Sequence, residues 1–593
     1  GGGQLYFLSD RMFAPQIDLV EWNFANNRQT GVYAMLLTAS ADNPFAPRNL
    51  EGVPEKDKDD EDGNGKDTGA PKVEIDFDGL AARVARAPID FGNLGGLSAT
   101  KEHLLFVGAP AFFYGRDIEP GAQLHAYSFE DREVFPITDK VSGYSLAAAS
   151  KQVVVNQEGA LNRFDIKKDE QQAKKADLDS LTAVRVRALE YEQIFDEVWR
   201  RYRDHFYVEN MHGYDWVALR DRYRPLLDHV AHRADLNYLI GEMISELNVG
   251  HAYVAGGDIA ATERSSDALL GATFELDESA GLYRIGTIYA GQNEEDKYRS
   301  PLTEAGVNAR PGDYVLAING RSLTAGINPY SLLKGQGGRL LELTLAGNAR
   351  GKDRRSVLIN PVASENDLLY LRWVQENHAR VTRETEGRIG YLHIPDMGAP
   401  GIYEFTKWFY GQVRKQGMII DVRGNGGGNV SQMVINRLAR DLVFMGYDRG
   451  IDNLDTYPNV VFTGSLVALL DEDSASDGDI FPAAFKALDL GPLIGKRSWG
   501  GIIGITNLGP LMDGGSVYVP QFATASAEGQ WAIEGVGVEP DIEVDNPPEA
   551  VLRGEDPQLE RAIEEALRRL RTNPGTLPPR PADPVKTPGT DSR

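Results

Sequence analysis

The sequence predicts a multidomain protein with β-propeller blades, a helical bundle, a small second unit of strands, and an α/β domain with a mostly parallel sheet. Three observations support this prediction. The chain has 593 residues, too many for a single hydrophobic core. Short apolar runs typical of strands fill the N-terminal part, segments with helical periodicity follow, and short strand-like runs then appear again. The last third alternates strand-like and helix-like segments, which is typical of a parallel sheet covered by helices.

The composition narrows the classes of partner and chemistry. With 62 basic and 87 acidic residues, the formal net charge is −25, which argues against nucleic acid or an anionic membrane as the main partner. The chain has no cysteine, so disulfides, thiolate metal sites and cysteine nucleophiles are excluded. No apolar run reaches the length of a membrane span. The start, GGGQLYFLSDR, has neither an initiator Met nor a signal peptide, so we expect a fragment or processed form.

Residues 1–178 are predicted to form propeller blades. Apolar runs such as QLYFLS, GVYAMLL and HLLFVGA are separated by turn signals, and repeated short strands of this kind are typical of propellers. The charged, glycine-containing segment 51–69 interrupts them. It is expected to be a solvated loop, with a metal or partner role as the weaker alternative.

Residues 179–260 are predicted to form a helical bundle. The run YEQIFDEVWRRYRDHF places its apolar residues on one helix face: Tyr191, Ile194, Phe195, Val198, Trp199, Tyr202 and Phe206. The segments DWVALRDRYRPLL and ADLNYLIGEMISELN continue the bundle. Gly250 is expected to act as the C′ residue of the last helix, which places His251 just past a helix end, on a turn into a strand.

Residues 261–365 are predicted to form a separate unit of short strands. In GVNARPGDYVLAINGRSL, Pro311-Gly312-Asp313 predicts a turn, YVLAI a strand, and Asn319-Gly320 a tight hairpin turn. This stretch resembles the PDZ domain, a module that binds peptide ends by adding a strand to an exposed sheet edge.

Residues 366–572 are predicted to form the α/β domain. The strands RIGYLHI, GMIIDV and SLVALL alternate with helix-like segments. Ligands bind such sheets outside the carboxyl ends of the strands, where DVRGNGGGN (421–429) and DEDSASDGD (471–479) both lie. An amphipathic helix, PQLERAIEEALRRL, then leads into a Pro-rich tail, 573–593, that is predicted to be disordered.

Two of these stretches offer chemistry. A serine between a buried strand and a helix start is either a nucleophile presented at the sheet edge or an ordinary helix N-cap. The consecutive Gly426, Gly427 and Gly428 leave backbone N–H groups uncovered, so they are candidates to bind an oxyanion or a substrate backbone, with a flexible turn as the alternative. A phosphate cradle is disfavoured because no Lys or Ser/Thr follows in the required spacing.

A serine nucleophile needs a base, and the chain has nine histidines. Structural roles are the default for the four within or beside the bundle: His205, His212, His229 and His232. His393 lies in a predicted strand, and His103 and His125 lie in the propeller-like part. His251 stands out only by its place beside a glycine after a helix.

The order of GHAYV, the PDZ-like unit, DVRGNGGGN and SASDGD resembles the tricorn protease family of large oligomeric serine peptidases. The resemblance covers nearly the whole chain. It implies the C-terminal part of a seven-bladed β-propeller, a helical domain carrying the catalytic histidine, a PDZ domain and a serine-peptidase α/β domain. The α/β domain is also similar to the C-terminal processing peptidases.

The resemblance implies a role for each candidate residue. Ser476 is the nucleophile and Ser474 a structural neighbour, His251 is the general base, and WAIEGVGVEPD (531–541) carries the last tetrad member on Glu534. The amides of Gly427 and Asp477 are the implied oxyanion donors. The implied substrate contacts are Gly426, Gly428 and Asp448. Asp448 would bind a basic side chain of the substrate, and Asp452 is the alternative for this role.

Two departures from related patterns matter. The family carries a serine before the histidine, which links it to the glutamate, but here that position is Gly250. Glu534 must then reach His251 directly, through a water, or not at all. The C-terminal processing peptidases use a Ser–Lys dyad, but in KRSWGG (496–501) Gly501 takes the place of the lysine, which favours the histidine mechanism.

The resemblance implies a cytoplasmic serine peptidase that trims oligopeptides released by a larger protease. Its implied partners are peptide substrates and further copies of itself in a homo-oligomer, a hexamer, with no nucleic acid, no membrane, no metal and no organic cofactor. Two alternatives stay open: a weak or inactive peptide-binding scaffold, and a carrier of small apolar ligands on the same fold.

Overall fold

The computed structural model describes residues 2–18, 23–46, 73–116, 121–147, 151–169, 171–178, 180–262, 264–449 and 455–586. The chain divides into two compact units, Gly1–Val184 and Arg185–Arg593. The predicted loop 51–69 lies outside the described residues, as do Asp452 and the end of the Pro-rich tail. No helix in the described part is long and apolar enough to cross a bilayer. The domain boundaries predicted from the sequence stay predictions.

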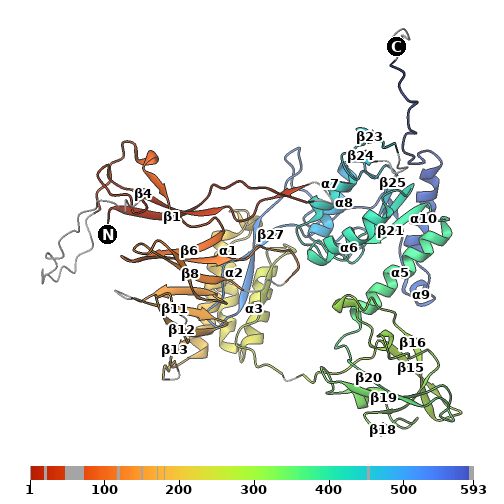
Figure 1. The fold of residues 1–593 in the computed structure, drawn as a ribbon. Helices are drawn as coiled ribbons and strands as arrows, with labels where there is room; N and C mark the ends of the chain where they lie inside the picture. The colour runs from red at the N-terminus through yellow and green to blue at the C-terminus, as the bar shows by residue number, and fades with distance from the viewer. Residues whose placement is uncertain are drawn as a thin grey trace. The chain divides into compact units, whose positions relative to one another are not determined.

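The first unit consists of small antiparallel sheets (Figure 1). Two are four-stranded meanders in sequence order, β6–β9 and β10–β13, and one has the order β1-β4-β5, with β2 and β3 forming a separate pair. Four-stranded meanders are the repeating unit of propellers, so these sheets are consistent with the predicted blades. The strands are β1 Gln4–Asp10, β2 Gln16–Ile17, β3 Phe24–Ala25, β4 Thr30–Leu36, β5 Val84–Arg86, β6 Asn93–Ala99, β7 His103–Ala109, β8 Gln123–Ser128, β9 Val134–Thr138, β10 Gly143–Leu146, β11 Gln152–Gln157, β12 Ala160–Asp165 and β13 Lys174–Lys175.

The second unit begins with the predicted helices α1 (Arg187–His205), α2 (Trp216–Tyr223) and α3 (Arg233–Ser245). The predicted apolar face of α1 is buried. One expectation is wrong: α3 ends at Ser245, so Gly250 is not its C′ residue, and Asn248 takes a positive φ of 50° in the connecting turn. The predicted second helix is also split, because α2 ends at Tyr223 and a 3₁₀ segment, Arg224–His229, follows with Pro225 in its first turn.

The strand that follows His251 pairs with the far end of the chain. β14 (Tyr253–Ala255) is antiparallel to β28 (Ser516–Phe522), which pairs with β27 (Gly504–Asn507). Val517 and Val519 of β28 belong to the same hydrophobic core as α1 and α3. The helical bundle and the C-terminal segment are therefore packed into one body, and His251 is held against residues more than 250 positions later.

The PDZ-like unit has the sheet order β15-β16-β17-β19-β20, with β18 pairing with β17. Asn319 (φ 48°) and Gly320 (φ 74°) form the turn between β17 and β18, as predicted, because both central residues of such a turn need positive φ. The elements are β15 Ala272–Asp277, β16 Leu282–Ile288, β17 Tyr314–Ile318, β18 Arg321–Ser322, α4 Pro329–Leu333, β19 Leu341–Ala346 and β20 Arg355–Ile359.

The α/β domain contains the predicted parallel sheet, with the order β21-β22-β25-β26-β29. One face packs against α6, α7 and α8, and the other against α5 and α10 (Figure 1). All six residues of β25 are buried, as a strand covered on both faces requires. The elements are α5 Asn366–Glu384, β21 Ile389–His393, α6 Ala399–Phe409, β22 Gly417–Asp421, α7 Ser431–Leu438, β23 Phe444–Gly446, β24 Asp455–Tyr457, β25 Ser465–Leu470, α8 Asp477–Ala487, β26 Leu493–Gly495, β29 Ile542–Glu543, α9 Pro548–Leu552 and α10 Pro557–Leu570.

Candidate active site

Ser476 lies at the turn between β25 and α8. Its backbone has φ 59° and ψ −120°, a region that a residue with a side chain enters at a cost of about 1–3 kcal/mol. Although Ser476 occupies the N-cap position, its side chain makes no capping hydrogen bond to the helix. Ser474 behaves differently: it is buried, and its hydroxyl donates to the carbonyl of Val422 at 2.9 Å. Strain and an uncommitted hydroxyl at Ser476 favour the nucleophile interpretation over the cap.

The glycine loop lies against this serine. A Cβ on Gly427, whose φ is +94°, would lie 2.5 Å from the Cβ of Ser476 and 3.0 Å from the amide nitrogen of Asp477. Only glycine permits this approach. The amide of Asp477 is the first in α8 and has no acceptor within the helix. Two predicted oxyanion residues therefore flank Ser476.

The Gly427 amide itself is already engaged. It donates to the Oδ1 of Asn425 at 3.0 Å, so it can serve an oxyanion only if the Asn425 side chain gives way. Gly426 and Gly428 are exposed on the same loop. The oxyanion and substrate roles of the three glycines stay predictions.

His251 is buried, with 8% of its surface exposed. Its Nδ1 lies 2.8 Å from the carbonyl oxygen of Ile503. Because a carbonyl only accepts, Nδ1 carries the proton, and Nε2 keeps the lone pair that a general base needs. The imidazole also contacts Trp499, with ring centroids 5.4 Å apart. The amide of Trp499 donates to the carbonyl of Ser474 at 2.9 Å, so this residue links the histidine to the serine turn.

Glu534 is bound to the backbone around His251 and not to its ring. Its Oε1 accepts from the amide of Gly250 at 3.1 Å, and its Oε2 accepts from the amides of Ile502 at 2.7 Å and Ile503 at 3.1 Å. Of the three possibilities left open by the sequence, a direct bond between Glu534 and the imidazole is not present among the described residues. The carboxylate instead holds the residue before the histidine and the residue whose carbonyl binds it.

Asp448 follows the short strand β23. The segment between β23 and β24 includes the alternative Asp452, which lies outside the described residues. The role of Asp448 in meeting a basic side chain stays a prediction.

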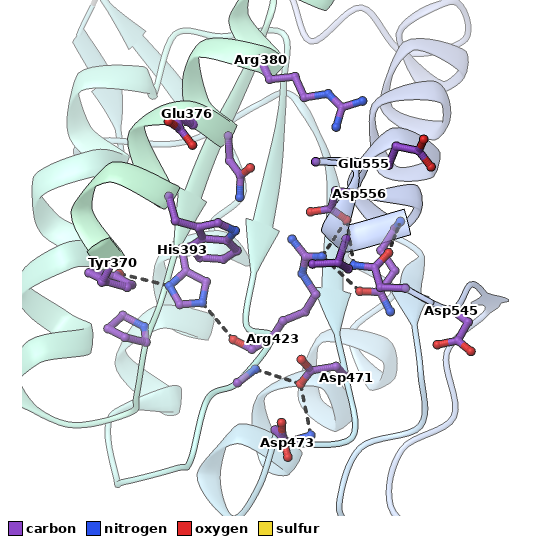
Figure 2. Close-up of a pocket in the computed structure, with 18 of the residues that line it drawn as sticks. Tyr370, Glu376, Arg380, His393, Arg423, Asp471, Asp473, Asp545, Glu555 and Asp556 are labelled. Atoms are coloured by element: carbon purple, nitrogen blue, oxygen red, sulfur yellow. Dashed lines mark hydrogen bonds and ion pairs between the residues drawn. The ribbon is translucent and has the colours of Figure 1, made fainter. Parts of the chain in front are cut away.

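A pocket of about 940 Å³ lies at the carboxyl edge of the sheet (Figure 2), yet Ser476, His251 and Glu534 are not among its lining residues. Arg423 forms ion pairs there with Asp421 at 2.6 Å and Asp556 at 2.9 Å. His393 has both ring nitrogens bonded, one to the Tyr370 hydroxyl and one to the Arg423 carbonyl, and burial lowers its pKa. These contacts indicate a structural role for the polar groups of this pocket, His393 included.

One residue that lines the pocket, Asp471, also contacts the segments around Ser476. Asp471 accepts from the Gly424 amide at 2.8 Å and from the Asp473 amide at 3.2 Å. This carboxylate therefore ties the glycine loop to the serine turn. Burial raises the pKa of Asp471, and the bond from Gly424 opposes the rise.

Sequence analysis did not single out Ile503 or Asp479. Ile503 contributes a backbone carbonyl, for which a side chain gives no signal. Asp479 is fully buried, and its carboxylate accepts from the amides of Gly500 at 2.8 Å and Gly501 at 3.3 Å. Its only signal in the sequence is the second aspartate of SASDGD, which by pattern indicates no more than a helix start.

The arrangement combines a serine hydroxyl that makes no capping bond on a strained turn, an imidazole whose Nε2 has no hydrogen-bond partner among the described residues, and a helix amide next to the serine. These are the parts that acyl transfer requires. Among the described residues, no cluster of three or more His, Asp or Glu side chains could hold a metal ion.

Three family models match the second unit. They are Peptidase family S41 over residues 388–544, the Tricorn protease C1 domain over 187–245, and the Tricorn protease PDZ domain over 268–364. Together they match the α/β domain, the helical bundle and the PDZ-like unit in the order that the sequence predicts.

Whole-chain comparisons agree. The chain is 35% identical over 595 residues to Tricorn protease homolog 1 of Streptomyces coelicolor, covering 98% of this chain and 55% of the relative. It is 31% identical to the Tricorn protease of Thermoplasma acidophilum, covering 98% of this chain and 52% of that one. The crystal structure of the tricorn protease superposes with a TM-score of 0.83 at 30% identity, over 96% of this chain and 54% of that one. The chain thus spans about half the length of these relatives.

Proposed function

Because the chain belongs to the tricorn protease family, we propose that it is a serine-type peptidase that hydrolyses peptides through an acyl-enzyme. The observation that carries this proposal is the state of Ser476. Its strained backbone and its side chain, which caps nothing, fit a nucleophile and have no other evident purpose. The relatives are named as proteases, in agreement with that chemistry.

The proposed reaction assigns one role to each of two side chains. The Ser476 oxygen attacks the peptide carbonyl while Nε2 of His251 takes the hydroxyl proton. The imidazolium then gives this proton to the leaving amine, which departs as the C–N bond breaks. Water, deprotonated by the same imidazole, attacks the acyl-enzyme and releases the acid and the free serine. The Asp477 amide stabilises the oxyanion, and Gly427 joins it when Asn425 gives way.

Gly250 does not argue for the inactive scaffold. The imidazole needs an acceptor at Nδ1 to fix its tautomer and orientation, and the Ile503 carbonyl supplies one at 2.8 Å. A serine hydroxyl before the histidine is then dispensable for that purpose. No specific observation favours the scaffold or the carrier of apolar ligands.

The finer features of the proposal rest on the family alone. They are oligopeptides from a larger protease as substrates, a preference for basic residues through Asp448, assembly into a hexamer, and a cytoplasmic location. The PDZ-like unit is proposed to position the peptides that reach the site.

A fluorophosphonate probe tests the proposal, because it reacts covalently with activated serines. We expect stoichiometric labelling of the purified protein and cleavage of fluorogenic peptides, both lost in Ser476→Ala. Ser474→Ala serves as the matched control, since its hydroxyl is buried and donates to the Val422 carbonyl, and a folded Ser474→Ala sample retains labelling. A folded wild-type protein that neither reacts nor cleaves peptides contradicts the proposal and supports the scaffold.

A further inference from the structure

Four consecutive residues between β26 and β27 have all their amides bound by two carboxylates. We call Gly500, Gly501, Ile502 and Ile503 the strap. Asp479 binds the amides of the first two residues, at 2.8 and 3.3 Å, and Glu534 binds those of the last two, at 2.7 and 3.1 Å. A run of four amides with no partner in a helix or sheet ladder is held in one conformation by these bonds.

The end of the strap holds the imidazole. Both polar backbone groups of Ile503 are fixed: its N–H donates to Glu534, and its carbonyl accepts from Nδ1 of His251 at 2.8 Å. The direction of the imidazole therefore depends on the conformation of the strap.

The start of the strap is joined to the nucleophile. Asp479 lies in the first turn of α8, three residues after Ser476, and is fully buried. Burial raises its pKa, and hydrogen bonds from Ser498, Gly500, Gly501 and the Ser476 backbone oppose that rise. One carboxylate thus contacts both the turn that presents the serine hydroxyl and the segment that orients the histidine.

The glycines of the strap are required by its path. A Cβ on Gly500 (φ +89°) would meet the Cα of Gly537 at 3.0 Å, and a Cβ on Gly501 would collide with the indole of Trp499. The strap is consequently built to lie under Trp499 and within reach of Asp479. A loop of arbitrary sequence would not fit this path.

We propose that Asp479 is a positioning residue of the peptidase reaction, because it fixes the strap to the serine turn so that the Ile503 carbonyl holds the His251 imidazole. This inference rests on the proposed function. It assigns to a backbone carbonyl the orienting task that the family's serine hydroxyl performs, at a site where this chain has Gly250. Keeping an aspartate buried at this position costs folding free energy, which the positioning task explains.

Asp479→Asn is the test variant. Asparagine has nearly the same shape but only one acceptor oxygen, so one strap amide loses its partner or faces an NH₂ group. We expect kcat to fall by about 10- to 100-fold with little change in KM, as for a small misplacement of a catalytic group. We also expect a shift of the acidic limb of the kcat/KM pH profile, which a purely structural defect would not move.

Glu365→Gln is the matched control. Glu365 is also a carboxylate whose pKa is raised by burial, and it accepts two backbone amides, from Gly271 at 2.7 Å and Ala272 at 3.2 Å. It lies just before α5, away from the strap. We expect Glu365→Gln to lose stability like Asp479→Asn while retaining the wild-type kcat and pH profile.

A double variant sharpens the test. If Asp479 and Glu534 act through one strap, the activity losses of Asp479→Asn and Glu534→Gln are not additive, and the double variant is little worse than the poorer single one. Fully additive losses, or a folded Asp479→Asn protein with wild-type kcat and pH profile, would overturn the inference.

Crystal structures of the wild type, Asp479→Asn and Glu534→Gln supply a readout that needs no turnover. We expect the strap and the His251 imidazole to shift in both variants, and Glu534→Gln covers the case in which Asp479→Asn does not fold. An imidazole that does not move in either variant contradicts the proposal that the strap orients His251. An unlabelled wild type contradicts the proposed function, so the two failures are distinguishable.

Discussion

Two polar clusters of the second unit contain a buried histidine, and they differ in which polar groups are left unpaired. In the pocket cluster, both nitrogens of His393 are hydrogen-bonded and Arg423 is paired with two aspartates. In the serine cluster, only Nδ1 of His251 has a partner among the described residues, and the Ser476 side chain caps nothing. A saturated network stabilises a fold, whereas an imidazole nitrogen and a serine hydroxyl that are not tied to the protein are available for chemistry.

The comparison also explains why the pocket lined by Arg423 and His393 is not the candidate active site. The 940 Å³ pocket offers volume, but its central arginine and histidine are fully engaged with the protein. In the serine cluster, the Ser476 side chain makes no capping bond, and Nε2 of His251 has no hydrogen-bond partner among the described residues. Polar groups that are left without a partner therefore identify the candidate active site better than pocket volume does.

The largest expected difference between the clusters is in activity. We expect His251→Ala to lower kcat/KM for a fluorogenic peptide by a factor on the order of 10⁴–10⁶, because the serine loses its base. We expect His393→Gln to retain activity per folded molecule within a few-fold. Rescue of His251→Ala by added imidazole would support the general-base role. Comparable losses in the two variants, with both folded, would remove the distinction drawn here.

The second difference is in stability. Arg423→Met leaves Asp421, which is fully buried, without its guanidinium partner. We expect a loss of about 3–5 kcal/mol in the free energy of unfolding, as for breaking a buried ion pair by removing one partner. Denaturant unfolding of the second unit measures it. Arg553→Met removes an exposed ion pair with Glu555 near the same pocket and is expected to change stability little. Equal effects of the two substitutions would mean that the pocket network contributes no special stability.

Features of the site that have a local sequence signal could be predicted from the sequence. The glycine loop, the serine turn and the parallel strands carry local signals, namely consecutive glycines, a buried run before a helix start, and alternating strands and helices. Each was found where the sequence placed it. The Asn319-Gly320 turn was predicted for the same reason, since positive φ at both positions selects those residues.

The orientation of His251 had no such signal. It depends on the pairing of β14 with β28 and on the carbonyl of Ile503, which are contacts between distant segments. The glycine at position 250 follows from the same packing. A Cβ there would lie 2.9 Å from the indole of Trp499 and 3.1 Å from the Cα of Gly501. The space that a serine side chain would need at position 250 is occupied by the indole of Trp499.

The smallest expected difference is in the pH dependence of stability. Burial lowers the pKa of His393 below its usual value, with Asp421 and the Arg423 carbonyl opposing the shift. The unfolded chain therefore binds a proton at His393 more readily than the folded one. This contribution to stability is fully present above the unfolded pKa, near 6.5, and is lost as pH falls towards the lowered folded pKa.

Unfolding free energies measured between pH 8 and pH 5 test this contribution. The slope from one histidine is at most about 1.4 kcal/mol per pH unit. His393→Gln is expected to be less stable at pH 8 and to lose stability less steeply on acidification than the wild type. The same substitution at His378 is the control. Burial lowers the pKa of His378 as well, but this residue lies on α5 and does not line the pocket. Parallel pH curves for the wild type and His393→Gln would show that His393 is not held neutral by the pocket cluster, and the contrast with His251 would then rest on hydrogen bonds alone.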